Sequence, residues 1–124
     1  MSSDKPSLRI LVIEDEAMVA MLLEDMLIEL GHQVVATAGE MHRAVKLASE
    51  LTVDLAIVDV NLHGEPAYPL ATILTGRRVP FFFATGYGAA GLKQEWRGVT
   101  ALQKPFQARE LAAAISRARQ DAIG

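Results

Sequence analysis

Four short apolar runs divide this chain, and a polar side chain follows each of them. The runs occupy residues 10–13, 55–58, 81–84 and 99–103. Short runs of consecutive apolar residues are typical of strands that are buried on both faces of a parallel sheet. The carboxyl ends of parallel strands lie along one edge of the sheet, where open α/β folds bind their ligands. We therefore expect the polar groups after these runs to converge at one site.

The stretches between the apolar runs alternate between helical and strand-like patterns. Strands are expected at 9–13, 33–38, 54–59, 80–84 and 99–103, and helices at 16–30, 40–51 and 107–120, with a short helix that ends near Gly76. Residues 60–69 contain Gly64, Pro66 and Pro69 and are predicted to form a loop. Strands that alternate with helices indicate an α/β fold, namely an open, doubly wound, five-stranded parallel sheet of order 2-1-3-4-5.

The stretch from Thr85 to Gly98 is the exception to this clear patterning. Gly86, Gly88 and Gly91 fall close together in it, and each glycine costs about 1 kcal/mol relative to alanine inside a helix. The fourth helix of the fold is therefore expected to be short or disordered. Local departures of this kind tend to fall at functional sites.

Several residues outside the predicted site are expected to have only structural roles. The apolar residues at helical spacing in the first helix are Met18, Met21, Leu22 and Leu30. We expect this set to face inward, with the methionines as core filler. The pair Arg77-Arg78 is expected to be solvated or to act as a charge pair at a helix C-terminus. The histidines are too widely spaced for a local metal motif and are expected at the surface: His32, His42 and His63.

Composition excludes several functional classes. With 124 residues, 51% hydrophobic and 22% charged, the chain suits one compact domain over 1–124 with a flexible stretch at 1–6. The formal net charge of −3 argues against direct nucleic-acid binding, and the lack of cysteine excludes disulfides and thiolate metal sites. The sequence has neither a signal-peptide pattern nor an apolar stretch of membrane length, so we expect a cytoplasmic protein without a membrane partner.

Acidic residues follow the first and third predicted strands, namely Glu14, Asp15 and Asp59. These strands are neighbours in the predicted order, about 4.8 Å apart. Two carboxylates about 5 Å apart repel by roughly 3 kcal/mol at an effective dielectric constant of about 20. A hard divalent cation with oxygen ligands, most simply Mg²⁺, would relieve this repulsion. Lys104 adds a fixed positive charge from the fifth strand, and Thr85 adds a hydroxyl from the fourth.

An acid cluster with a metal, a lysine and a hydroxyl meets the needs of phosphoryl transfer. Asp59 is the best candidate for the nucleophile, because it stands centrally and the other acids are better placed to hold metal. Lys104-Pro105 is a candidate for a cis peptide bond. Each group alone has an ordinary explanation as a turn former or helix cap. The presence of such groups on four adjacent strand ends favours the functional interpretation.

Nearly the whole chain resembles the flavodoxin-like receiver domain of two-component response regulators. The matching residues are Glu14-Asp15 for the acidic pair, Asp59 for the phosphoacceptor, Thr85 for the switch hydroxyl and Lys104-Pro105-Phe106 for the lysine motif. The resemblance implies that Asp15, Asp59 and the backbone carbonyl of Asn61 bind Mg²⁺, with Glu14 helping through water. It also implies that Asp59 receives its phosphoryl group from a phosphohistidine on a partner kinase, and that water later hydrolyses the aspartyl phosphate.

Residues 80–87 resemble the signature of a narrower group, the FAT GUY receivers. Receivers usually carry a switch aromatic three residues before the lysine, where this chain has Ala101. A rotation of Thr85 coupled to an aromatic side chain on the fifth strand is therefore not expected. Tyr87 is a candidate replacement for that aromatic. The second candidate mechanism is that phosphorylation orders the glycine-rich segment.

The leading expectation for function is a stand-alone response regulator, without an output domain, in two-component phosphorelay signalling. Its partners would be a sensor histidine kinase or a phosphotransfer protein, and an unknown downstream protein. The downstream protein would bind the face formed by the fourth helix (within 85–98), the fifth strand (99–103) and the last helix (107–120). It would not be an enzyme beyond weak self-catalysed phosphotransfer and autodephosphorylation. The alternative within this class is a phosphate sink or a shuttle between kinases.

Two other classes fit the residues less well. Metal-dependent phosphohydrolases with an aspartate nucleophile generally place it after strand one, with a second aspartate two residues later. This chain has Ala17 at that distance from Asp15, which argues against the class. A pseudo-receiver that binds partners without phosphorylation is disfavoured by the complete set of acids, hydroxyl and lysine.

Overall fold

The computed structural model describes residues 6–123, so most of the stretch predicted to be flexible, 1–6, lies outside the described residues. The elements in chain order are β1 (Arg9–Ile13), α1 (Ala17–Glu29), β2 (Gln33–Ala38), α2 (Met41–Glu50), β3 (Leu55–Asp59), β4 (Asn61–Leu62), β5 (Glu65–Pro66), α3 (Tyr68–Gly76), β6 (Phe81–Thr85), the 3₁₀ helices η1 (Gly88–Gly91) and η2 (Gln94–Trp96), β7 (Ala101–Gln103) and α4 (Ala108–Ile123).

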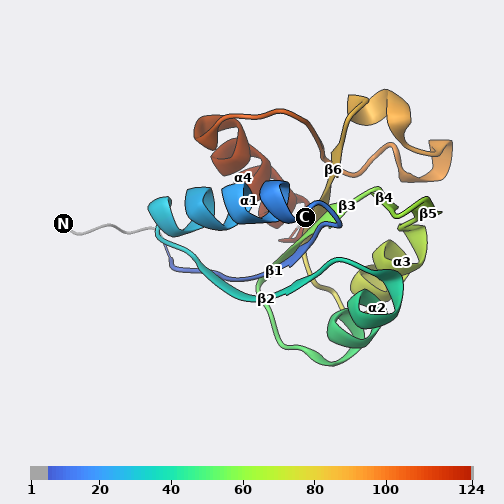
Figure 1. The fold of residues 1–124 in the computed structure, drawn as a ribbon, viewed down its shortest axis with the longest axis horizontal. Coiled ribbons are helices and arrows are strands. Elements are labelled where there is room, and N and C mark those ends of the chain that lie inside the picture. The colour runs from blue at the N-terminus through green and yellow to red at the C-terminus, as the bar shows by residue number, and fades with distance from the viewer. Residues whose placement is uncertain (1–5, 124) are drawn as a thin grey trace.

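The main sheet has five parallel strands in the order β2-β1-β3-β6-β7. Numbered along the chain without the two short strands β4 and β5, this is the predicted order 2-1-3-4-5. The prediction of an open, doubly wound α/β fold is confirmed. Helices α1 and α4 cover one face of the sheet, and α2 and α3 cover the other (Figure 1).

The strands are apolar at consecutive positions because successive side chains enter opposite layers of the core. Ile10 and Val12 pack under α1 and α4, whereas Leu11 and Ile13 pack under α2 and α3. Neighbouring phenylalanines of β6 divide in the same way, with Phe82 in the first layer and Phe83 in the second. This two-sided burial fixes the strand ends rigidly along one edge.

The predicted loop 60–69 is partly wrong, because it contains the small antiparallel hairpin β4–β5. The turn of this hairpin is formed by His63 and Gly64, both in the left-handed region with φ of 50° and 87°. The side-chain Oδ1 of Asn61 accepts a hydrogen bond of 2.7 Å from the Gly64 N–H. Side-chain bonding of this kind lets asparagine start a tight turn.

The segment between β6 and β7 forms two short 3₁₀ helices, η1 and η2, in place of an α-helix. This agrees with the short fourth helix that the glycines predicted. Strand β7 is also shorter than expected, because it begins at Ala101 and not at Val99.

The predicted inward face of α1 is wrong for three of its four residues. Met18, Met21 and Leu22 are 78%, 63% and 57% exposed, and the buried residues of the helix are Leu23 and Leu27. The helix carries apolar residues in adjacent rows around its surface, so spacing alone did not select the row that faces the sheet. The result is an exposed apolar stripe on α1.

Arg77 has a structural role that the sequence did not reveal. Its Nη1 donates hydrogen bonds to the carbonyls of Ala48 and Leu51, at 2.6 and 3.0 Å, and so caps the C-terminus of the neighbouring helix α2. Arg78 is exposed, as expected. His32 corrects another expectation, because it is half-buried and its Nδ1 accepts a hydrogen bond from the Leu8 N–H. The other two histidines are exposed.

Within residues 6–123, no helix combines the length and apolarity needed to cross a membrane.

Candidate functional site

The parallel register brings the predicted site residues to one edge of the sheet. Ile13 pairs with Val58, so Glu14 and Asp15 leave β1 beside Asp59 at the end of β3. Asp59 pairs with Ala84, the residue before Thr85, and Thr85 pairs with Gln103, the residue before Lys104. The four strand ends therefore meet, as the sequence predicted.

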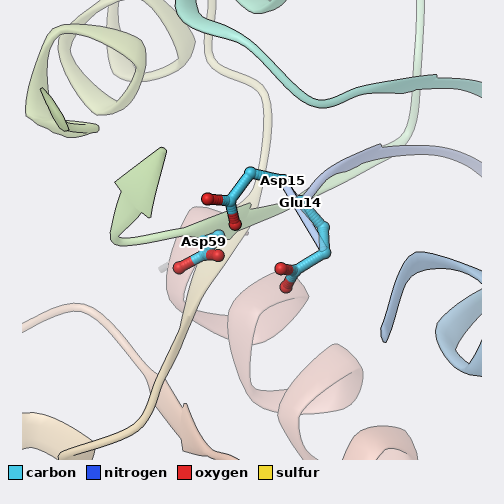
Figure 2. Close-up of side chains that lie close together, drawn as sticks. All are labelled: Glu14, Asp15 and Asp59. Carbon is cyan, nitrogen blue, oxygen red and sulfur yellow. The ribbon is translucent and has the colours of Figure 1, made fainter. Parts of the chain in front are cut away.

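Three carboxylates surround a common space at this edge (Figure 2). Glu14, Asp15 and Asp59 each offer an oxygen, and these oxygens lie within 4.8 Å of one another. Glu14 and Asp59 are only 4% and 6% exposed, while Asp15 is half-buried. Buried carboxylates this close together need a cation nearby.

Lys104 supplies one positive charge to the cluster. Its Nζ lies 2.8 Å from Glu14 Oε1 and 3.2 Å from Asp59 Oδ2, and it donates a hydrogen bond to the latter. The contact with Glu14 is an ion pair by distance without the alignment of a hydrogen bond, so the buried Oε1 of Glu14 lacks an aligned donor. One lysine therefore does not satisfy the two buried carboxylates completely.

The pKa values of the cluster follow from this shortage of positive charge. Burial raises the pKa of Glu14 to about 7, although the contact with Lys104 opposes the change. Burial also raises the pKa of Asp59 against the opposing hydrogen bond from the Asn61 N–H. For Lys104, burial acts to lower the pKa, but the close contact with Glu14 and the charge of Asp59 outweigh it and raise the pKa. The lysine is therefore charged, while Glu14 keeps its proton to a higher pH than a free carboxyl group does.

Backbone N–H groups hold the two aspartates in place. The Asn61 N–H donates to Asp59 Oδ1 at 3.1 Å, and the His63 N–H donates to Asp15 Oδ2 at 2.9 Å. Burial acts to raise the pKa of Asp15, but the His63 N–H and the neighbouring acids outweigh it and lower the pKa. Sequence reasoning did not connect His63 with Asp15. The hydrogen bond comes from the backbone N–H, which every residue type except proline offers, and the imidazole Nδ1 of His63 lies 3.7 Å from the same Oδ2.

The cluster fits a hard divalent cation. Three carboxylates supply the oxygen ligands that Mg²⁺ prefers, and one of their buried oxygens, Oε1 of Glu14, has no hydrogen-bond donor. Asn61, whose carbonyl is the fourth predicted ligand, is two residues from Asp59 and bonded to it through its N–H. The residues present thus match the donor set that such an ion requires.

The predicted phosphoryl-binding hydroxyl belongs to a buried residue. Thr85 lies at the end of β6, and its Oγ1 accepts a hydrogen bond of 3.1 Å from the Tyr87 N–H. The Lys104 N–H donates to the carbonyl of Thr85 at 2.8 Å, which ties the ends of β6 and β7 together. The Lys104–Pro105 peptide bond is cis. Tyr87 itself is 81% exposed.

Comparison with known proteins gives consistent results. Residues 10–116 match the family described as response regulator receiver domain. The chain is 34% identical to the transcriptional regulatory protein PdtaR of Mycobacterium tuberculosis over 86% of its own length and 54% of that protein. It is 36% identical to the phyllosphere-induced regulator PhyR of Methylorubrum extorquens, over 88% of this chain and 42% of PhyR.

Among solved structures, that of SdrG from Sphingomonas melonis Fr1 is similar over almost its whole length. The TM-score is 0.82 with 37% identity, and the alignment covers 90% of this chain and 96% of SdrG. The chain spans about half the length of the curated relatives PdtaR and PhyR.

Proposed function

The chain belongs to the response regulator receiver domain family, and we propose that it is a phosphorylation switch in a two-component phosphorelay. The observation that carries the proposal is the position of the Asp59 carboxylate. Its Oδ2 lies 3.2 Å from Lys104 Nζ, and its Oδ1 is held by the Asn61 N–H. Two other acids stand beside it, with Thr85 at the end of the adjacent strand.

In the proposed reaction, a carboxylate oxygen of Asp59 attacks the phosphorus of a phosphohistidine on a sensor histidine kinase or a phosphotransfer protein. The phosphorus–nitrogen bond breaks as the phosphorus–oxygen bond forms, and the departing imidazole takes a proton from solvent. Lys104 offsets the negative charge of the transferred group, and the Thr85 hydroxyl donates to one of its oxygens. Water later attacks the phosphorus, which releases inorganic phosphate and restores the Asp59 carboxylate.

Mg²⁺ held by Asp15, Asp59 and the Asn61 carbonyl, with Glu14 helping through water, would neutralise charge on the phosphoryl oxygens. The chain's own residues do the positioning. The backbone N–H groups of Asn61 and His63 fix the two aspartates, and burial between β1, β3 and β6 limits access of water to Asp59.

We further propose that the chain acts in the cytoplasm and has no enzymatic turnover beyond self-catalysed phosphotransfer and dephosphorylation. Its output would be altered binding of a downstream protein at the surface formed by η1, η2, β7 and α4. This is the surface predicted from the sequence, with β7 as its fifth strand and α4 as its last helix. The 3₁₀ helices η1 and η2 lie where the fourth helix was expected.

Mass spectrometry can test the central step directly. The chain is incubated with Mg²⁺ and a small acyl phosphate, and we expect one added phosphoryl group, located at Asp59. Asp59→Asn should abolish the addition, whereas Asp25→Asn, on the exposed surface of α1, should leave it unchanged. A chain that stays unmodified, or one modified equally in the Asp59→Asn variant, would contradict the proposal and favour a pseudo-receiver.

A further inference from the structure

A cavity lies at the opposite edge of the sheet from the acid cluster, between the end of α1, the start of β1 and α4. Its volume is about 330 Å³, which is at the lower end of the range for pockets that hold small ligands. Leu8, Leu30 and Ile115 form apolar walls, and all three belong to the core layer under α1 and α4. The apolar body of a small ligand would be shielded from water here.

The polar side chains that line this cavity include a cation but no acid. They are His32, Ser116, Arg119 and Gln120. Arg119 is half-buried, and among residues 6–123 neither an ion pair nor a hydrogen bond engages its guanidinium group. A guanidinium group offers paired N–H donors whose spacing matches a carboxylate. The cavity therefore favours a ligand with a negative charge.

The end of α1 fixes the position of His32. Gly31 has a φ of 92°, and its N–H donates to the carbonyl of Ile28 at 2.9 Å. The His32 N–H donates to the carbonyl of Leu27, also at 2.9 Å. These two bonds form a Schellman motif, which a glycine in the left-handed region permits. The Leu8 N–H then holds the imidazole ring through a bond of 3.1 Å to Nδ1.

The bond from Leu8 also determines which ring nitrogen of His32 can donate to a ligand. Because Nδ1 accepts a hydrogen bond, the proton of the neutral ring is on Nε2. Burial lowers the pKa of His32, and the charge of Arg119 lowers it further, so the ring is neutral near pH 7. The effect of Arg119 on the ring also shows that the two side chains are close to each other. His32 thus adds an Nε2–H donor beside the guanidinium group.

We propose that this cavity binds a small organic acid, with its carboxylate between Arg119 and His32 and its apolar body against Leu8, Leu30 and Ile115. The guanidinium group donates two parallel hydrogen bonds to the carboxylate, and the Nε2–H of His32 donates a third. The bound acid bridges α1 and α4. The inference does not rest on the proposed function, since the length of β1 separates this cavity from the candidate phosphoacceptor site.

Titration of the chain with hexanoate, followed by two-dimensional amide NMR spectra, tests the site. We expect saturable shifts of the Leu8 and His32 backbone signals and of the Arg119 Nε–H signal. Hexanamide has the same apolar body without the charge, and inorganic phosphate has charge without the apolar body. Both should bind at least about tenfold more weakly than hexanoate. The inference is overturned if hexanoate shifts none of these signals, or if it binds no better than hexanamide or phosphate.

Two arginines of α4 provide a matched pair of variants. Arg119→Gln should weaken hexanoate binding by about tenfold or more, because the charged partner of the carboxylate is lost. Arg117→Gln is the control, since Arg117 is exposed on the same helix and does not line the cavity. It should bind hexanoate as the parent chain does. Equal binding by the two variants contradicts the role of Arg119 and overturns the inference.

His32→Asn tests the second donor separately from the fold. The asparagine oxygen can still accept from the Leu8 N–H in place of Nδ1, but the Nε2–H donor is gone. We expect a folded chain, judged by its amide spectrum, that binds hexanoate about tenfold more weakly. A folded variant with unchanged affinity overturns the assignment of His32. If the variant does not fold, the arginine pair decides the inference alone.

Discussion

The carboxyl group of Glu14 is the most displaced from its behaviour in water, because it is buried beside Asp59 with only one lysine between them. Its pKa is about 7, against an ordinary value of 4.5. The register of β1 and β3 holds the acidic residues close together in spite of their mutual repulsion. The acids therefore store unfavourable electrostatic energy that a cation can release.

This shift predicts how stability depends on pH. In the unfolded chain Glu14 loses its proton near pH 4.5, whereas in the folded chain it keeps the proton up to about pH 7. The folded state thus binds more protons in this window, and its free energy of unfolding should fall as pH rises, by at most about 3 kcal/mol. The raised pKa of Asp59 acts in the same direction, while the lowered pKa of Asp15 acts at more acidic pH.

Urea unfolding in metal-free buffer at about pH 5 and about pH 7 measures this difference. Glu14→Gln is the control, because an amide cannot titrate and should remove most of the dependence. A free energy of unfolding that is equal at the two pH values, or that rises with pH, would show that the carboxyl group of Glu14 is not buried as described.

At the scale of elements, α1 presents an apolar stripe to solvent. Met18, Met21 and Leu22 are exposed on the helix that follows the acidic pair, while Leu23 and Leu27 hold it to the sheet. Helices that are apolar on more than one face normally cover part of that surface with a partner. Because these side chains are exposed in the chain by itself, they should contribute little to its stability, whereas Leu23 and Leu27 should contribute much.

Substitutions on the exposed face and on the buried face of α1 should have very different effects on the free energy of unfolding. Met21→Gln should change the free energy of unfolding by less than about 0.5 kcal/mol, because the side chain is already in water. Leu23→Ala, two residues later, should lower it by about 2–4 kcal/mol through lost burial and the cavity left behind. Chemical denaturation of both variants gives the comparison. Similar losses in the two would mean that the helix is rotated from the orientation described.

At the scale of the whole molecule, the charged residues at the ends of β1, β3 and β7 meet in one cluster, so a cation bound there would join β1 to β3. Under the proposed function, Mg²⁺ would bind the assembled cluster and not the unfolded chain, and it should therefore raise stability by mass action. We expect millimolar Mg²⁺ to raise the melting temperature by about 5 °C. Sodium chloride of equal ionic strength is the control for general screening.

Asp59→Asn extends this prediction. Removing one of three crowded carboxylates should leave the metal-free chain at least as stable as the parent, and should reduce its response to Mg²⁺. Thermal melting of both chains, with and without the ion, measures this. Marked destabilisation of the metal-free variant would mean that Asp59 supports the fold rather than the site.

The sequence determined the fold class and the convergence of the site, because short apolar strands that alternate with helices favour a doubly wound parallel sheet buried on both faces. Asp59, Thr85 and Lys104 immediately follow or end such strands, so their meeting at one edge followed from topology alone. The glycines between Thr85 and Gly98 likewise predicted a short or disordered fourth helix, and two 3₁₀ helices lie there.

Only the tertiary structure decided which row of α1 faces the core, where Arg77 binds and what surrounds Thr85. The buried and the exposed rows of α1 consist of similarly apolar residues, so hydrophobicity does not distinguish them. Packing against the sheet determines which row is buried. The hydrogen bonds from Asn61 and His63 to the two aspartates are made by backbone N–H groups, which side-chain identity does not specify. The close approach of Gly91 to Thr85 depends on how a whole segment packs across the end of the sheet, and long-range packing of this kind leaves no local pattern in the sequence.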